Sequence, residues 1–185
     1  MAKKKAKQKI DLSTLYNHFR FLVAFDPSLD GTGYAVLDCR FKEPRIAEMG
    51  VVKGRTSTWA AETPHQVKLA LITAKVKELR SKYDPIFPIV FLERGFTKGN
   101  NATQATFKAR GALETELVGI HVVEYPPTTV KLATTGYGAS SKDEVAEHMA
   151  NVFGITVDDF ETEDVSDALA VAYTGYKEYS EYFKK

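Results

Sequence analysis

Four acidic residues of the sequence stand where predicted strands or helices begin or end. Asp26 directly follows the apolar run FLVAF, and Glu93 directly follows the apolar run IVFL. Asp164 and Asp167 are three residues apart in EDVSDALAVA, so their carboxylates lie on one face at the start of a helix. Each acid therefore sits where a buried element meets solvent.

Each acid taken singly also has an ordinary structural explanation. Asp26 is equally well a turn aspartate that accepts hydrogen bonds from nearby backbone amides. Acids in the first turn of a helix, such as Asp164 and Asp167, complement the helix dipole, which is worth about 0.3 to 1 kcal/mol. Only the combination of the acids favours a functional site.

Four carboxylates brought together cannot all stay ionised without cations. Because no histidine cluster accompanies them, the donor set favours Mg²⁺ over Zn²⁺, with Mn²⁺ as a substitute. Two such ions about 3.5 to 4 Å apart can activate a water and stabilise the leaving oxygen of a phosphodiester. We therefore expect Asp26, Glu93, Asp164 and Asp167 to form a two-ion site for phosphodiester hydrolysis.

The elements that position these acids can be read from apolar patterns, turn residues and helix caps. Strands are predicted over 21–25, 34–37, 45–52, 86–92 and 121–125, with Pro27, Gly31 and Gly33 in the first turn. Helices are predicted from Thr63-Pro64 to Tyr83, from Asn100 or Asn101 to about 118, from Ser141 to about 153 and from Asp164 to about 182, with a helix or turn at 128–139 and a short helix or irregular lead-in at 11–20.

This order of elements predicts an α/β fold. The strands come first as a hairpin-connected group and then alternate with helices, which favours a mixed central sheet with helices on both faces. The chain has 185 residues, of which 44% are hydrophobic, so one domain with a normal core is expected.

The formal charge of +1 conceals a basic amino-terminal segment. Five lysines and no acid lie in the first nine residues. We expect 1–20 to be a flexible basic extension, which could be a phosphate-binding arm, a localisation signal or a solubilising end, and 21–185 to be the single folded domain. The single cysteine, Cys39, excludes an internal disulfide, and no apolar run is long enough for a membrane span. The protein is therefore expected to act inside the cell, in the cytoplasm.

At these motifs the chain resembles the RuvC-type Holliday-junction resolvases. The resemblance rests on five stretches in the family's order, covering about 21–176: FDPSLDGTGYAVL, FLERGF, GNNATQATFKARGALE, YPPTTVKLATTGYGASSKDEVAEHM and EDVSDALAVAYTGY. It implies a ribonuclease H-like fold, a homodimer, and cleavage of four-way DNA junctions with magnesium or manganese. Ser28 in place of the family's glycine, the basic extension and the early carboxyl terminus favour a divergent, viral branch.

The resemblance also implies roles for single residues. The metal-binding carboxylates would be Asp26, Glu93, Asp164 and Asp167. Phe96 would lie against bases near the junction centre, where stacking on DNA is worth about 1 to 3 kcal/mol per base; its alternative is to fold back onto the core. Lys131 and Lys142 would contact phosphates near the cut, with Lys142 stabilising charge there. Further phosphate contacts, or else solvated charges, are expected at Arg94, Lys98, Lys108 and Arg110.

A stripe of small residues follows one face of the predicted helix that starts at Asn100 or Asn101. It comprises Ala102, Ala105, Ala109, Ala112 and Leu113. The bare pattern favours packing against the chain's own sheet, whereas the resemblance favours a dimer interface.

The function expected is therefore metal-dependent, structure-specific endonuclease activity on four-way junctions through paired symmetric incisions. A broader branched-DNA or flap endonuclease is the alternative within nucleases. A remote alternative is an actin-like phosphotransferase or ATPase, since 26–33 also resembles the phosphate-binding hairpin of those proteins. That alternative would need a second phosphate loop and a larger chain.

Overall fold

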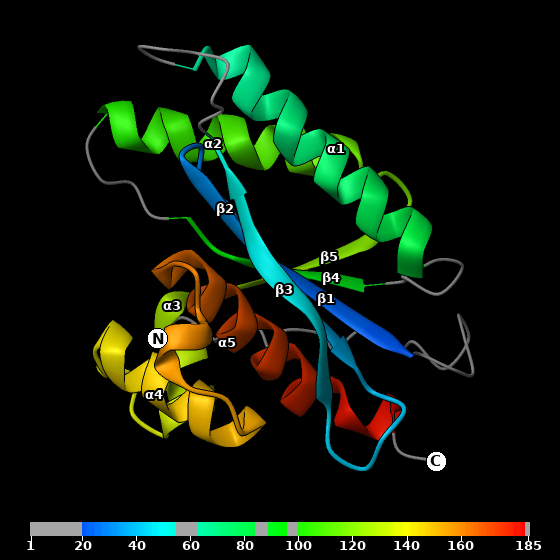
Figure 1. Cartoon of the computed structure of the whole chain (residues 1–185), viewed down its shortest axis with the longest axis vertical. Helices are drawn as coiled ribbons and strands as arrows, with labels where there is room; N and C mark the ends of the chain where they lie inside the picture. The colour runs from blue at the N-terminus through cyan, green and yellow to red at the C-terminus, as the bar shows by residue number, and fades with distance from the viewer. Residues whose placement is uncertain (1–19, 55–62, 84–88, 96–99, 184–185) are drawn as a thin grey trace, which may run out of the picture.

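The computed structural model of the protein describes residues 20–54, 63–83, 89–95 and 100–183 (Figure 1). The predicted lead-in over 11–19 and the lysine-rich segment lie outside these residues. The elements are β1 (Phe21–Asp26), β2 (Gly31–Asp38), β3 (Arg45–Lys53), α1 (His65–Tyr83), β4 (Ile89–Glu93), α2 (Asn100–Thr115), β5 (His121–Tyr125), α3 (Pro127–Thr135), α4 (Lys142–Phe153) and α5 (Glu163–Tyr179), with single 3₁₀ turns at Val157–Asp159 and Ser180–Tyr182.

The five strands form one mixed sheet in the order β3-β2-β1-β4-β5. β1 pairs antiparallel with β2, and β2 with β3, as consecutive hairpins. β4 pairs parallel with both β1 and β5, so the later strands return through helical crossovers. The mixed sheet expected from the sequence is confirmed.

Helices cover both faces of this sheet (Figure 1). Alternate residues of β1 point to opposite faces: Val23 and Phe25 pack with α1 and α2, whereas Leu22 and Ala24 pack with α3, α4 and α5. A strand buried on both faces needs apolar residues at every position, which explains the uninterrupted run FLVAF. None of the helices in the described residues is long and apolar enough to cross a membrane.

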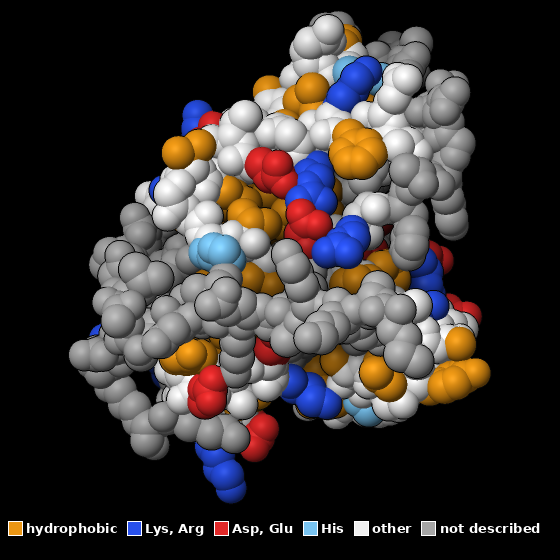
Figure 2. Space-filling view, turned by 180° about the vertical axis from the view of Figure 1, so that it is seen from behind, with side chains coloured by type: hydrophobic (Ala, Val, Ile, Leu, Met, Phe, Trp, Pro, Cys, Tyr) orange, Lys and Arg blue, Asp and Glu red, His pale blue; other side chains and the backbone are white. Residues whose placement is uncertain are grey.

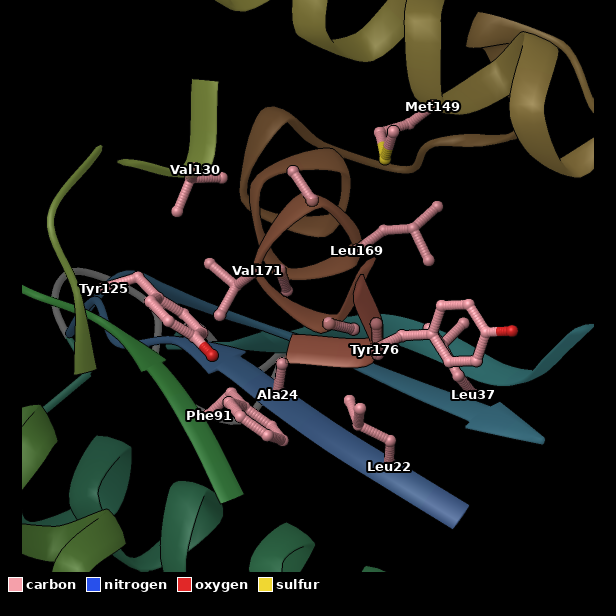
Figure 3. Packing of buried hydrophobic residues seen from close by; sticks show 14 of the residues in the cluster. Leu22, Ala24, Leu37, Phe91, Tyr125, Val130, Met149, Leu169, Val171 and Tyr176 are labelled. Atoms are coloured by element: carbon pink, nitrogen blue, oxygen red, sulfur yellow. The ribbon is translucent and has the colours of Figure 1, made fainter. Parts of the chain in front are cut away.

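The core on the α5 side holds that helix firmly against the middle of the sheet (Figure 3). The rings of Phe91 and Tyr125 stack with their centroids 5.7 Å apart, and Leu169 and Val171 of α5 are fully buried in the same cluster. Burial of each large apolar side chain contributes about 1.5 to 3 kcal/mol. The packing of α5 in this core consequently fixes the position of its first turn.

Several predicted boundaries were wrong by a few residues. Gly31 and Gly33 belong to β2 and not to the turn. Glycine is required at these two positions because α5 packs against the strand there and leaves no room for a side chain. α2 ends at Thr115, after which the chain tightens into turns up to Gly119, whose φ is +84°. α3 ends at Thr135, and α5 ends at Tyr179 before a 3₁₀ turn.

One local prediction was confirmed in atomic detail. The hydroxyl of Ser141 accepts a hydrogen bond from the Glu144 amide (3.1 Å), and the Glu144 carboxylate accepts one from the Ser141 amide (2.6 Å). This reciprocal capping box fixes the point at which α4 begins. Lys142, the first residue of the helix, is therefore held at a defined position.

Candidate active site

Asp26 and Glu93 lie side by side at the ends of two parallel strands. β1 and β4 are in register with Phe25 opposite Leu92, and each acid is the next residue along its strand. Their side chains are also close enough for each to influence the pKa of the other. The parallel pairing thus converts two separate sequence positions into one pair of carboxyl groups.

The first turn of α5 reaches this pair because of Gly33. Gly33 is opposite Asp26 in the antiparallel register of β1 and β2. A Cβ atom at Gly33 would stand only 1.9 Å from the carbonyl oxygen of Asp164, which is far inside contact distance. The missing side chain therefore allows the backbone of α5 to rest on β2 beside Asp26.

The electrostatics show that all four predicted acids share one neighbourhood. The pKa of Asp26 is raised well above its usual value by burial and, in decreasing order, by the negative charges of Glu93, Asp167 and Asp164. Burial and the charge of Asp167 raise the pKa of Glu93 to about 7, and burial also raises that of Asp164. The site is a pocket of negative charge that favours either protons or cations.

Lys142 supplies part of the positive charge that this acidic site favours. Its Nζ lies 2.7 Å from Oδ2 of Asp167 and 3.4 Å from a carboxylate oxygen of Glu163. Desolvation alone would lower the pKa of Lys142, but these ion pairs outweigh it and leave the pKa raised. Lys131 on α3 is a second cation near the site, since its charge lowers the pKa of Glu93.

The donor set fits a hard divalent cation. All four acids offer carboxylate oxygens, the ligands that Mg²⁺ and Mn²⁺ prefer, and burial together with the neighbouring negative charges raises the pKa of Asp26 despite the charge of Lys142. Within the described ranges, no group of three or more His, Cys, Asp or Glu side chains is already arranged as a metal cage. The fit lies in the chemistry and proximity of the donors.

Comparison with known proteins decides the family. The model of the family described as crossover junction endodeoxyribonuclease RuvC matches residues 22–175. The chain belongs to the RuvC family. It is 31% identical over 157 residues to the crossover junction endodeoxyribonuclease RuvC of Synechococcus sp. (strain CC9902), covering 84% of this chain and 97% of that one. The RuvC of Prochlorococcus marinus (strain MIT 9211) is 29% identical, with coverage of 84% and 94%.

Solved structures agree with this assignment. The Thermus thermophilus RuvC structure matches with a TM-score of 0.71 and 26% identity, covering 87% of this chain and 95% of that one. The T. thermophilus RuvC in complex with a Holliday junction substrate matches with the same TM-score and identity, covering 84% and 92%. The yeast mitochondrial Holliday junction resolvase Ydc2, at 13% identity, a TM-score of 0.57 and coverage of 91% and 81%, shares the fold. The ribonuclease H-like fold expected for a RuvC protein is thereby confirmed, whereas the viral branch stays a prediction.

The basic residues predicted to contact DNA differ in their surroundings in the structure. Arg94 is half exposed, and its Nε lies 3.4 Å from Oε2 of Glu124. Arg110 also pairs with Glu124, and its Nε lies 2.6 Å from Oε1 of Glu114. Figure 2 shows acidic and basic side chains interleaved on the face seen from behind. Without DNA, these two arginines are therefore both paired with glutamates.

Other predicted DNA contacts remain sequence-based. Phe96 and Lys98 lie outside the described residues, so their predicted roles in base stacking and phosphate contact stay predictions. Lys108 is exposed on α2. Exposure is compatible with a phosphate contact and equally with a solvated charge.

The small-residue stripe of α2 packs against the chain's own core where its side chains are described. Ala109 and Leu113 are fully buried in the cluster that includes Ile72 and Val76 of α1, and Ala105 packs against the same cluster. The expectation that Ala109 and Leu113 contact a second subunit was therefore wrong. The small side chain of Ala109 allows α1 and α2 to pack closely within one chain.

A hollow of about 380 Å³ between α3 and α4 is separate from the four predicted metal ligands. It is lined by Thr135, Tyr137, Ser140, Glu144, Glu147, His148 and Asn151. None of the four predicted metal ligands borders it. The hollow is therefore not part of the predicted metal site.

Gly33 is the functional position that sequence reasoning missed. The sequence pattern predicts a turn residue there, whereas Gly33 lies in β2 and its backbone packs directly against the backbone of Asp164. A signal was present in the sequence, because a glycine inside an apolar strand pattern often marks the close approach of another backbone.

Proposed function

We propose that this protein is a metal-dependent endonuclease that resolves four-way DNA junctions by paired symmetric incisions. The observation that carries the proposal is the convergence of Asp26, Glu93, Asp164 and Asp167. Burial and the charges of the other three acids raise the pKa of Asp26, and such a group calls for compensating cations. The activity named for the RuvC relatives, and the RuvC complex with a Holliday junction, support the choice of substrate.

The four carboxylates would hold two Mg²⁺ ions, with Mn²⁺ able to substitute. When bound, such ions supply an activated water and neutralise charge at the scissile phosphate. Around them the chain's own residues have separate tasks: Asp26 and Glu93 are fixed by paired strands, and Asp167 is held toward Lys142 by their ion pair. Water attack would leave 5′-phosphate and 3′-hydroxyl ends.

The surrounding cations would position the DNA. Lys142 stands at the start of α4 beside Asp167, where an ammonium group can stabilise charge on a phosphate at the cut. Lys131, close enough to influence Glu93, would contact a neighbouring phosphate. Arg94, Phe96 and Lys98, which follow Glu93 in the sequence, would meet the strands near the branch point.

The larger assembly is also part of the proposal. A four-way junction has two equivalent strands to cut, and the described domain has one acidic cluster, so a homodimer is expected to act on it. Residues 21–185 would form the nuclease domain, and the basic residues 1–20 would be an extension that contacts phosphates. The protein would work inside the cell, where its branched DNA substrates occur.

Incubation with labelled branched DNA tests this function. Four-way, three-way, flap and linear duplex substrates of one sequence are mixed with the protein and Mg²⁺, and Glu93→Gln protein purified in the same way controls for contaminating nucleases. Paired nicks at symmetric positions of the four-way junction, with ligatable ends, are expected. Equal cutting of flaps and three-way forms would favour the broader branched-DNA enzyme. Hydrolysis of ATP in a parallel reaction that contains it, without any cutting of DNA, would favour the actin-like phosphotransferase.

A further inference from the structure

We propose that Lys68 is a positioning residue which, through Asp30, holds the chain segment after Asp26 against Asp164 and thereby sets the affinity of the site for metal. The inference rests on the proposed metal-dependent function. Lys68 lies on α1, on the face of the sheet opposite α5 (Figure 1). It therefore belongs neither to the four predicted metal ligands nor to the basic residues proposed to contact DNA.

Lys68 is an unusual lysine because its side chain is buried. Only 7% of that side chain is exposed, and its Nζ lies 2.6 Å from Oδ1 of Asp30, whose own side chain is 80% exposed. A buried ammonium group is costly unless it is paired and hydrogen-bonded. The pair therefore restrains Asp30 from the interior of the protein, unlike an ion pair between two mobile surface chains.

Asp30 is the point at which several restraints on the β1–β2 connection meet. Its carbonyl oxygen accepts a hydrogen bond from the Gly54 amide at 2.9 Å. One residue earlier, Leu29 is buried in the core on the α1 side. The Thr32 hydroxyl, on β2, donates to the Ser28 carbonyl oxygen at 2.7 Å. The connection is thus fixed to α1 and to Gly54, the residue after β3, rather than exposed as a free loop.

The residue after Asp30 touches a predicted metal ligand. A Cβ atom at Gly31 would stand 2.9 Å from Oδ2 of Asp164, so the backbone at Gly31 walls in that carboxylate. If Asp30 shifted, Gly31 would move with it, and the Asp164 carboxylate would gain freedom to rotate. Groups that only orient a metal ligand commonly change metal affinity by about 10- to 100-fold.

The test compares metal binding by the wild type with that of Lys68→Met, which keeps the length of the side chain and removes its charge. Thermal unfolding of the DNA-free protein is followed during titration with Mn²⁺, and junction cleavage is followed during titration with Mg²⁺. The two metal midpoints are the Mn²⁺ concentration that gives a fixed rise in melting temperature and the Mg²⁺ concentration that gives half-maximal cleavage, and both are expected to rise about tenfold in the variant. The cleavage rate at saturating Mg²⁺ is expected to recover to within about threefold of wild type, because the ligands themselves remain.

A matched control is available on the same helix. Lys82 also forms a 2.6 Å ion pair, with Glu48, but it is exposed and remote from Asp164. Lys82→Met should leave both metal midpoints unchanged. Asp30→Asn, a change at an exposed side chain, is the second variant and should shift the midpoints in the same direction as Lys68→Met.

The possible outcomes separate this inference from the function on which it rests. Metal midpoints that equal those of the wild type in both Lys68→Met and Asp30→Asn would overturn the positioning role. An equal loss of cleavage at every Mg²⁺ concentration would also overturn it, since that is the result of a merely unfolded fraction. A wild-type protein that responds to neither metal would overturn the proposed function itself, and the positioning role with it.

Discussion

Burial of Asp26 beside three other carboxylates gives the site its chemical character. Water can screen an exposed acid, but this one is desolvated at a strand end and faces the charges of Glu93, Asp167 and Asp164. Lys142 offsets part of that charge, and its shortest contact is with Asp167. The residues thus form a site whose stability and activity should both depend on what neutralises it.

Neutral replacement of a single acid should stop cutting without stopping binding. Glu93→Gln and Asp164→Asn are each expected to lower junction cleavage at least about a hundredfold, since even residues that only support a metal ligand cost up to that much. Junction affinity measured with EDTA should stay within a few-fold of wild type, because acids repel phosphate rather than attract it. Glu161→Gln, an exposed acid paired with Lys53, is the control. Binding that falls in parallel with cutting would contradict the assignment.

The metal-free protein should lose stability as the pH rises, and Glu93 should account for part of the loss. An unfolded glutamate has a pKa of about 4.3, whereas burial and Asp167 raise the pKa of native Glu93 to about 7. Between these values the native state holds a proton that the unfolded chain has released. The stabilisation is therefore fully present below about pH 4.3 and is lost as the pH rises through about 7.

Urea unfolding in EDTA at a series of pH values measures this effect. From pH 5 to pH 8 the free energy of unfolding of the wild type should fall relative to that of Glu93→Gln, because glutamine cannot ionise. Acids remote from Glu93 titrate equally in both proteins and cancel in the difference, whereas Asp26, whose pKa the charge of Glu93 raises, adds to the difference in the same direction. A difference that stays constant with pH would show that Glu93 is not desolvated in the native state.

At the scale of elements, the site depends on how closely α5 rests on β2. Gly33→Ala would place a methyl group within 1.9 Å of the Asp164 carbonyl oxygen, so the helix must move. We expect a loss of about 1 to 3 kcal/mol in stability, typical of overpacking, together with a large loss of cleavage. Gly111→Ala is the matched control, since nothing lies within 4 Å of the added methyl on exposed α2. Normal cleavage by Gly33→Ala would contradict the role of this contact.

The packing of α2 gives a second prediction at this scale. Ala109 is fully buried between α2 and the core, so Ala109→Glu should destabilise each subunit by about 3 to 5 kcal/mol, the cost of an uncompensated buried charge. Gln104→Glu, at an exposed position of the same helix, should change the urea midpoint little. If Ala109→Glu left the midpoint unchanged, Ala109 would not be packed in this core.

At the scale of the whole molecule, symmetric resolution requires two acidic clusters. An isologous dimer would relate them by the same two-fold axis that relates the equivalent strands of the junction. The buried stripe of α2 no longer serves as its contact surface. Among the described side chains of that helix, Phe107 is a large hydrophobic residue with 54% of its surface exposed. It is a more suitable position at which to test association.

Sedimentation and a cruciform plasmid test the dimer. The wild type should sediment as a dimer and yield linear plasmid, which needs two incisions within one complex lifetime. Phe107→Glu should shift the mass toward the monomer and the product toward nicked circles, with unchanged unfolding of the subunit. A wild type that stays monomeric with and without DNA, yet linearises the plasmid, would refute paired action by a dimer.

The sequence by itself determined the elements and the chemical class of the site. Apolar runs that end at Asp26 and Glu93, the two acids that open α5 and the capping box of Ser141 are local patterns, and each depends on residues only a few positions apart. Their order was sufficient to predict a mixed sheet with helices on both faces and a set of oxygen ligands. The roles proposed for Phe96 and Lys98 still rest on the sequence alone.

Only the tertiary structure decided which residues meet across the fold. The contact of Gly33 with Asp164, the burial of Ala109 within its own subunit and the pairing of Arg94 with Glu124 each join separate elements of the chain. The pair formed by Lys68 and Asp30 joins α1 to the hairpin in the same way. Periodicity shows that a face is apolar or that a residue is small, but it does not name the partner. The partner is chosen by the packing of the whole chain, because burying a side chain or a charge is favourable only against the surface that the other elements provide.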